Sequence, residues 1–305
     1  MKSKKIVNVE EMPHPDYVIY VDTDSVYINV DVLMLLDAIE PDNRKSYAVR
    51  EIAAMSAAIN RFYDVLMTRA FNSTDHRIRI AEDVVASSAF WLAKKRYAMM
   101  KVYNMELNKD VDDLEVKGLD VVRSSFPKRF RSLMEEVLRD ILNSKDKAYL
   151  DAKILGFKAQ MPTFPINEIA KNTSVKFVSQ KTKVDFNPKS RHPFRFLPGS
   201  TAQCKASLAY NDMLSTYELV ETEPILSGGK VKWTYLKENP LGLDGLAFKD
   251  DGKDPLRVMD FIATYVDRNK IWEAELQSKL VDFYQALRWP IFSVDDEKIN
   301  EFFSF

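Results

Sequence analysis

Cysteine is almost absent from this 305-residue chain, because Cys204 is its only cysteine. One cysteine excludes an internal disulfide and a zinc site built from several cysteines, and it fits a reducing cytoplasm. Apolar runs are short: none approaches the roughly 18 residues of a membrane-spanning helix, so no membrane partner is expected. The start, MKSKKIVNVEEM, has basic residues without an apolar core behind them, which excludes a typical export signal.

Histidine is scarce too. His14, His76 and His192 are scattered without metal-binding spacing, so we expect them to be structural or surface residues. The net charge of −1 argues against a uniformly basic nucleic-acid binder. Residues 171–205 nevertheless carry eight Lys or Arg and one acid, Asp185. This segregation fits a surface that meets phosphates, and it equally fits a solvated loop.

The hydrophobic pattern predicts an α+β protein with a boundary near residues 118–125. Residues 44–71 carry an apolar stripe at helical spacing, with Asp42 as the expected N-cap and NSTD at 72–75 as the stop. A second helix should follow Ser125 as its cap, with Pro127 in its first turn. The acidic run NKDVDDLE at 108–115 has the composition of a turn. The remaining expected elements are strands at 17–21, 26–30, 77–85 and 96–105, a helix at 203–216, a strand-and-turn insert at 228–248 and helices within 256–288.

Two aspartates, Asp22 and Asp24, stand between two β-branched runs in YVIYVDTDSVYINV. Residues i and i+2 of a strand share a face, so both carboxylates can project together and hold a cation such as Mg²⁺. A surface turn is the simpler interpretation, since Asp, Thr and Ser favour turns. An EF-hand loop is excluded, because its glycine and its final acid would fall on Tyr27 and Leu33.

Five segments, in order, resemble conserved segments of the family B DNA polymerases. YVDTDSVY resembles the Tyr-Gly-Asp-Thr-Asp-Ser palm motif, with Val21 in place of glycine, and FWLAKKRYAMM resembles the Lys-x-Tyr motif. KGLDVVRSSFPKRF is similar to the palm-to-thumb junction, and LKENPLGLDGLAF to a thumb segment of the T-even-phage type. The terminal EFFSF is the fifth. Val21 should point away from the acidic face, so only a local packing change is expected there.

The resemblance implies three regions: the C-terminal part of a polymerase palm at 1–120, a mainly helical thumb at 121–290 and a clamp-binding tail at 291–305. In the family, the exonuclease domain, the fingers and another metal-binding aspartate precede the DTDS motif. The chain is therefore expected to be the C-terminal part of a split polymerase. A natural split gene and a cloned fragment would look alike.

Site residues follow from the matched motifs. Asp24 matches the ligand common to two Mg²⁺ ions, which would be shared with the partner chain, and Asp22 matches its neighbour. Asp83, with Glu82 as the competing candidate, matches a third acidic position. Lys95 resembles the lysine that approaches the minor groove of the nascent base pair, and Tyr97 resembles the tyrosine on the primer backbone. Both would contact DNA irrespective of its sequence.

The thumb junction and the tail complete the expected sites. Arg123, Ser124, Ser125 and Lys128 match residues where the thumb meets the duplex, and cations with hydroxyls suit phosphates there. In the tail, Ile299, Phe302 and Phe303 share one helical face, and Phe305 is last. That spacing matches clamp-binding peptides, although the tail could instead fold back onto the thumb.

The expected function is DNA-directed DNA polymerisation, the transfer of a nucleotide from dNTP to a primer 3′-hydroxyl. The expected partners are primer–template DNA, dNTP, an N-terminal polymerase chain and a sliding clamp, in the cytoplasm of a host if the protein is phage-encoded. RNA-templated polymerases are a rival, but they usually carry adjacent aspartates. A non-catalytic DNA- or clamp-binding protein derived from a polymerase fragment is the alternative from another class.

Overall fold

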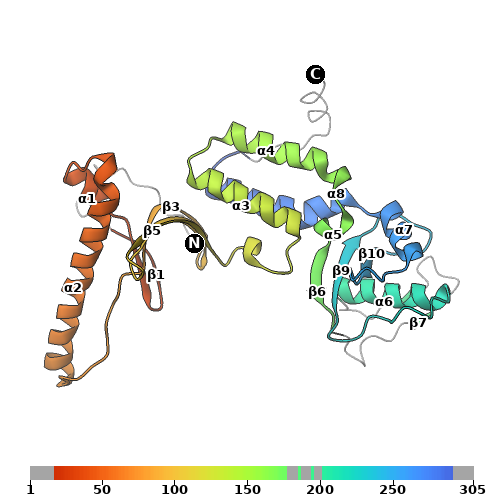
Figure 1. Cartoon of the computed structure of the whole chain (residues 1–305), viewed down its shortest axis with the longest axis horizontal. Coiled ribbons are helices and arrows are strands. Elements are labelled where there is room, and N and C mark those ends of the chain that lie inside the picture. The colour runs from red at the N-terminus through yellow and green to blue at the C-terminus, as the bar shows by residue number, and fades with distance from the viewer. Residues whose placement is uncertain (1–16, 177–184, 187–193, 196–200, 291–305) are drawn as a thin grey trace. The chain divides into compact units, whose positions relative to one another are not determined.

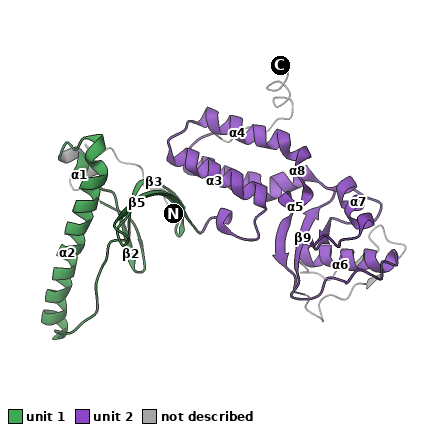
Figure 2. Cartoon of the chain, in the orientation of Figure 1, with its two compact units in different colours: residues 1–117 green, residues 118–305 purple. Residues whose placement is uncertain are grey.

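The computed structural model describes residues 17–176, 185–186, 194–195 and 201–290. They fall into two compact units, residues 1–117 and 118–305 (Figures 1 and 2). Helices are combined with antiparallel sheets, which confirms the α+β class. Within the described ranges, no helix is both long and apolar enough to cross a membrane.

Unit 1 consists of a hairpin, a three-stranded sheet and a long helix. The hairpin pairs β1 (Val18–Asp22) with β2 (Ser25–Ile28), and the sheet has the order β3-β4-β5. Its strands are β3 (Val84–Ala93), β4 (Arg96–Asn104) and β5 (Lys109–Lys117), and its helices are α1 (Asp31–Leu36) and α2 (Arg44–Phe71).

Helix α2 has the predicted bounds and ends at Asn72, whose left-handed backbone forms the C-cap. Its predicted cap is wrong. Pro41 begins a 3-10 turn, Pro41–Asn43, that includes Asp42, so Asn43 takes the N-cap position without a side-chain hydrogen bond. Tyr47 and Ala48 of α2 lie in the core of the unit with Met34 and Val85.

Two predictions in unit 1, one of a strand and one of a turn, are corrected. Residues 77–83 are irregular and the strand begins only at Val84. The acidic run predicted as a turn belongs to β5, because lysines on neighbouring elements balance its charge. Lys101 Nζ of β4 lies 2.8 Å from Asp113 Oδ2, and Lys45 Nζ lies 2.7 Å from Asp110 Oδ2.

Unit 2 is mainly helical around a three-stranded antiparallel sheet of order β10-β9-β6, and β7 and β8 form a separate antiparallel pair. The buried core lies between that sheet and α6, and Tyr210, Trp233, Phe248 and Ile262 contribute to it. In β10, a Cβ on Gly245 would stand 2.8 Å from the Thr234 carbonyl oxygen, so only glycine fits there. The elements are α3 (Lys128–Leu142), α4 (Lys147–Gln160), α5 (Ile166–Ile169), β6 (Lys171–Ser174), β7 (Asp185–Phe186), β8 (Phe194–Arg195), α6 (Ala202–Thr216), β9 (Lys230–Tyr235), β10 (Gly245–Phe248), α7 (Leu256–Tyr265), α8 (Arg268–Ile271), a π-helical turn (Trp272–Gln277) and α9 (Ser278–Ala286).

Helix α3 buries Phe130, Met134 and Val137. Ser125 does not cap it, which corrects that prediction. The chain turns first, with Phe126 N donating to Arg123 O at 3.0 Å, and Pro127 then occupies the N-cap position.

Candidate catalytic and nucleic-acid-binding site

The DTDS segment forms the tip of the β1–β2 hairpin. Asp22 pairs with Ser25 across the strands, so Thr23 and Asp24 form a two-residue turn, with Thr23 in the left-handed region at φ 44°. Asp24 N donates to Asp22 O at 2.5 Å. Asp22 therefore ends a strand while Asp24 lies in the turn, and the expectation that both project from one strand face is wrong. Val21 is exposed, on the opposite face of β1 from Tyr20 and Asp22, as predicted.

A second hairpin tip, between β3 and β4, meets the first. Ala93 pairs with Arg96, and Lys95 in the turn has φ 62°. The Lys95 backbone N–H donates to the Tyr20 hydroxyl at 3.0 Å. The Lys95 ammonium lies 3.2 Å from Asp22 Oδ1. The structure thus brings Lys95 to Asp22, with Asp24 two residues further along the turn, although about seventy residues separate the two motifs. We call this region the hairpin-tip site.

Four aromatic rings pack together on the strands that lead to the hairpin-tip site: Tyr20, Tyr27, Trp91 and Tyr97. The Trp91 ring lies 5.0 Å from those of Tyr20 and Tyr27 and 4.6 Å from that of Tyr97, centroid to centroid. Such tilted contacts stabilise aromatic clusters and fix ring positions. Trp91 is therefore a packing residue.

Tyr97 is the least exposed of the predicted DNA-binding residues, with 5% of its surface accessible. Its hydroxyl lies 2.6 Å from that of Tyr27. Burial, together with this hydrogen bond, raises the pKa of Tyr97 well above its ordinary value. In the described structure the hydroxyl contacts protein, and its contact with a primer stays a prediction.

Asp83 and Glu82 lie away from the hairpin tips. Both precede β3, whereas Lys95 follows it, and a strand of 10 residues extends over roughly 33 Å. The Glu82 carboxylate accepts a hydrogen bond from Ser56 on α2, while Asp83 is exposed. The structure does not bring either acid to Asp22 and Asp24, and the third acidic position stays a prediction.

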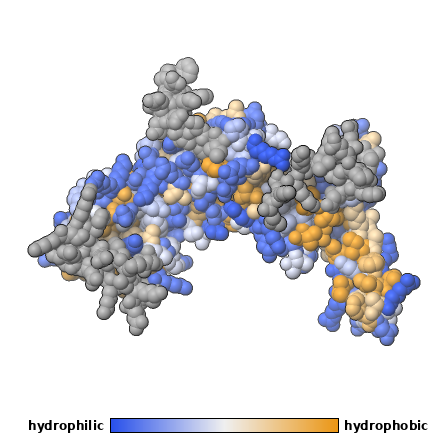
Figure 3. Space-filling view, turned by 180° about the vertical axis from the view of Figure 1, so that it is seen from behind, coloured by the Kyte–Doolittle hydropathy of each residue, from blue (hydrophilic) through white to orange (hydrophobic). Residues whose placement is uncertain are grey.

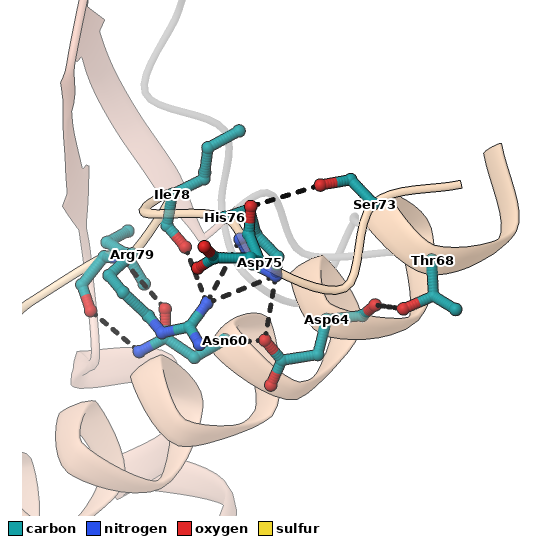
Figure 4. A network of polar contacts seen from close by, with 9 residues as sticks. Asn60, Asp64, Thr68, Ser73, Asp75, His76, Ile78 and Arg79 are labelled. Atoms are coloured by element: carbon teal, nitrogen blue, oxygen red, sulfur yellow. Dashed lines mark hydrogen bonds and ion pairs between the residues drawn. The ribbon is translucent and has the colours of Figure 1, made fainter. Parts of the chain in front are cut away.

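A polar network missed at the sequence level holds residues 76–82 against α2. Ser56, Asn60 and Asp64 follow one another at four-residue spacing along the helix. Asn60 donates to Ile80 O and accepts from Ile80 N, both at 2.8 Å. Asp64 Oδ1 lies 3.0 Å from Nε2 of the buried His76 and 2.9 Å from Nη2 of Arg79 (Figure 4). His76 is thus structural, as predicted; His14 and His192 lie outside the described residues.

The predicted thumb contacts lie in the loop before α3 and, for Lys128, at the first residue of that helix. Arg123, Ser124, Ser125 and Lys128 are all exposed, between the buried Val121 and Phe130. Arg131 Nη2 fixes the loop by donating to the backbone oxygens of Arg123 and Phe126, at 2.9 and 3.1 Å. The Arg123 guanidinium lies 3.0 Å from Asp120 Oδ1. Hydroxyls and cations on a fixed loop at a helix N-terminus can bind phosphates.

No protein-family model matches the sequence of this chain. The DNA-directed DNA polymerase of Enterobacteria phage T4 is 25% identical over 288 residues, which cover 89% of this chain and 30% of the phage enzyme. The resemblance to the T-even-phage polymerase is confirmed. The chain thus spans about 30% of the length of its polymerase relative, in line with a match to its C-terminal part.

As a relative of the phage polymerase, the chain carries hard oxygen donors suited to Mg²⁺ at the hairpin tip. Asp24 is exposed, and no hydrogen bond or ion pair engages its carboxylate within the described ranges; Asp22 Oδ1 faces Lys95. Among the described residues, no cluster of three or more His, Cys, Asp or Glu could hold a metal. Two carboxylates fit part of a Mg²⁺ site, and further ligands would have to come from elsewhere.

The predictions for the basic stretch 171–205 and for the tail concern residues that the structure describes only in part. Of the basic stretch 171–205, Lys171 pairs at 2.9 Å with Oε1 of the buried Glu275, so its charge is used inside unit 2. Most of that stretch lies outside the described residues. So do the tail residues Ile299, Phe302, Phe303 and Phe305.

Proposed function

We propose that this chain supplies the C-terminal palm and the thumb of a DNA-dependent DNA polymerase, and that a separate N-terminal chain completes the enzyme. The observation that carries the proposal is the ion pair of Lys95 with Asp22, two residues from the exposed Asp24, at the hairpin-tip site of a chain related to the T4 polymerase. Unit 1 corresponds to the palm and unit 2 to the thumb.

The reaction joins the primer 3′-oxygen to the α-phosphorus of a dNTP. The bond to pyrophosphate breaks, and the hydroxyl proton passes to solvent. Asp24, with Asp22 beside it, would hold Mg²⁺ together with an aspartate of the N-terminal chain. When bound, Mg²⁺ lowers the pKa of the 3′-hydroxyl and stabilises the charge of the leaving pyrophosphate. Asp24 suits this role because its carboxylate stands exposed at the tip of a tight turn.

Lys95 and the loop of unit 2 would hold the duplex. The Lys95 side chain is 62% exposed, so its ammonium can meet acceptors in the minor groove that recur at every base pair. Arg123, Ser124, Ser125 and Lys128 would contact phosphates, which position the duplex without reading its sequence. Each phosphate contact made by a cation should steepen the salt dependence of binding.

The partner chain would cover apolar surface on unit 1. The stripe of α2 is buried at Ala48, but Phe62 is 60% and Leu66 is 37% exposed further along the same stripe. On the β1–β2 hairpin, the outward face exposes Ile19, Val21 and Val26. Figure 3 shows apolar side chains gathered over this part of unit 1. Contiguous apolar surface of this kind marks interaction sites.

The N-terminal polymerase chain is the occupant that fits this surface best. Along α2, the side that carries Asn60 and Asp64 is already occupied by residues 76–82, whereas the stripe with Phe62 and Leu66 is open. About 70% of the length of the T4 relative has no counterpart in this chain. The additional metal ligand and the apolar cover would then come from the same partner.

The tail is proposed to bind a ring-shaped sliding clamp. Ile299, Phe302 and Phe303 would enter an apolar groove of the clamp, and Phe305 would follow. Tethering raises the effective concentration of the enzyme at the primer end. Product length with and without clamp should differ for the intact chain and should not differ for a chain ending at Lys298.

Primer extension tests the proposed function. The 305-residue chain alone should not extend a primed template, and mixing it with the N-terminal polymerase chain from the same source should start synthesis. The non-catalytic alternative predicts DNA or clamp binding with no extension in the mixture. Robust extension by the chain alone would exclude the split arrangement.

A further inference from the structure

A groove runs between α3 and α4, the two helices of unit 2 that the short loop 143–146 joins (Figure 1). Its volume of about 380 Å³ falls within the roughly 300–1,000 Å³ of typical ligand pockets. Its apolar lining includes the buried Leu133 and Phe164, and the ring centroids of Phe157 and Phe164 lie 4.9 Å apart. None of its lining residues belongs to the predicted catalytic, DNA-binding or clamp-binding sites.

Gly156 is the unusual residue of this α3–α4 groove. It lies inside α4, where glycine destabilises a helix relative to alanine. Glycine is typical of positions where another group approaches the backbone closely. Apart from its chain neighbours and the backbone of its own helix, a Cβ on Gly156 would have no described heavy atom within 4 Å. No described residue therefore accounts for the glycine, and the open space beside it can take a side chain from another segment.

The rim of the groove carries a cation on each helix. Arg129 of α3 pairs through its Nε with Glu168, and a guanidinium has four further N–H donors. Lys153 of α4 pairs with Asp140 and, at 3.4 Å, with Glu136 Oε2. Among the residues that line the groove, these two cations face one acid, Glu136. An acidic segment with aromatic side chains would complement both the rim and the apolar lining.

The tail, residues 291–305, is the segment that can reach this groove, because the described chain reaches residue 290 beside α4. The Trp289 ring lies 5.8 Å from that of Tyr284, and the Tyr284 hydroxyl donates to Asp151 Oδ1 of α4 at 2.6 Å. A segment as long as the tail can span up to about 50 Å. Helix α4 is only roughly 21 Å long, so the whole groove lies within that distance.

The tail also has the composition that complements the groove. It holds four acids and one lysine and therefore carries a net charge of −3. Its apolar residues Ile299, Phe302 and Phe303 have the spacing of one helical face. The tail thus combines aromatic side chains for the apolar lining with carboxylates for the basic rim.

We propose that the α3–α4 groove is the intramolecular docking site of the tail. The apolar face of the tail enters the groove over Gly156, and its acids lie at the rim with Arg129 and Lys153. The same apolar side chains are proposed to bind the sliding clamp, so the tail can occupy the groove or the clamp but not both. The docking goes beyond the proposed function, whereas the competition with the clamp rests on it.

Disulfide trapping in the 305-residue chain tests the docking. Gly156→Cys with Ser304→Cys places one thiol in the groove and one in the tail, and the disulfide yield in a glutathione buffer gives their effective concentration. It should be at least tenfold higher than for Val220→Cys with Ser304→Cys, because Val220 is exposed in the same unit and does not line the groove. Adding Phe302→Ser and Phe303→Ser should lower it to the level of this control pair.

The single-cysteine variants show whether either new thiol bonds to the buried Cys204, and thermal unfolding checks that Gly156→Cys retains the fold. Equal effective concentrations in the groove pair and the control pair would overturn the inference. So would disulfide-linked dimers whose yield rises with protein concentration, because the tail would then enter the groove of a second copy. Either result would leave the proposed function standing.

Clamp affinity tests the competition. Gly156→Phe fills the groove from α4 and should raise the affinity for the clamp from the same source at least threefold, as expected if the groove holds two-thirds or more of the tails. Val220→Gln changes an exposed side chain outside the groove and should bind the clamp like the wild type. Unchanged affinity in Gly156→Phe would overturn the competition. If even the wild-type chain did not bind the clamp, the role of the tail in the proposed function would fail, while disulfide trapping would still decide the docking.

Discussion

The hydroxyl oxygens of Tyr27 and Tyr97 lie 2.6 Å apart, although 70 residues separate them in the sequence. This hydrogen bond joins the β1–β2 hairpin to β4 beneath the hairpin-tip site. Because both rings are packed against Trp91, the bond contributes to the stability of the site as well as to its geometry.

Tyr97→Phe should therefore lower the free energy of unfolding by about 0.5–1.5 kcal/mol, because it leaves the Tyr27 hydroxyl without its partner. Tyr27→Phe should cost a similar amount. The double variant should cost less than the two single changes together, since they remove the same bond. Urea unfolding of the four proteins gives the coupling, and strictly additive effects would show that the bond does not stabilise the protein.

The exposed part of the apolar stripe on α2, at Phe62 and Leu66, should contribute to binding of the N-terminal polymerase chain and little to the stability of the folded chain. Leu66→Gln is expected to change the free energy of unfolding of the isolated chain by less than about 0.5 kcal/mol, because the side chain is already partly in water. It should weaken binding to the N-terminal polymerase chain at least tenfold. Calorimetric titration measures this. Val220→Gln, at a position 91% exposed in unit 2, is the matched control and should bind normally.

Asp64 anchors the segment 76–82 through His76 and Arg79. Asp64→Ala should raise amide hydrogen exchange at the backbone of this segment by about tenfold or more, because local opening no longer breaks these contacts. Exchange in β3 and β4 should not change. Asp110→Ala, which removes a surface pair with Lys45, is the control. Unchanged exchange at Ile80 would contradict the anchoring role.

Asp212 on α6 should make unit 2 less stable as the pH rises. Burial raises the pKa of this carboxyl to about 6, from 3.8, and its Oδ2 has no hydrogen-bond partner among the described residues. The folded state therefore binds the proton more tightly than the unfolded state. The stability present near pH 4 is lost as the pH rises through about 6. The full effect is on the order of 2–3 kcal/mol at most.

Asp212→Asn should accordingly stabilise the chain at pH 7.5 by about 1–2 kcal/mol and by nothing measurable at pH 4. Urea unfolding at the two pH values shows the difference. Glu218→Gln changes an exposed acid just beyond the same helix and should be neutral at both. A gain of equal size at pH 4 and pH 7.5 would rule out the ionisation of Asp212 as its cause.

Sequence periodicity predicted α2 well, because its apolar stripe and the left-handed Asn72 both act within the helix itself. It failed for residues 77–83. RIRIAED alternates like a strand, but the backbone of Ile80 is bonded by the side chain of Asn60 instead of by another strand. Here the side-chain amide of Asn60, on α2, takes the place of a neighbouring strand as the hydrogen-bond partner of Ile80. The alternation of apolar and polar residues in 77–83 is the same with either partner, so it could not reveal this.

In the candidate site, too, local sequence predicted some features, and tertiary contacts that the sequence does not reveal determined the others. The DTDS and KKRY motifs predicted Asp22, Asp24, Lys95 and Tyr97 as candidate site residues from local pattern alone. The pairing of Lys95 with Asp22 and the bond from Lys95 to Tyr20 arise only when two hairpin tips meet in space, so the motifs alone could not predict them. The length of β3, in turn, separates Asp83 from these residues.

The most direct test of the account is single-turnover nucleotide incorporation by the enzyme reconstituted from this chain and the N-terminal polymerase chain. Asp24→Ala should slow incorporation by several orders of magnitude, because it removes the exposed carboxylate that would hold Mg²⁺, while primer–template binding stays within about twofold. Asp22→Ala should cost less. An Asp24→Ala enzyme that incorporates nucleotide within about tenfold of the wild-type rate would contradict the assignment of the hairpin tip as the catalytic centre.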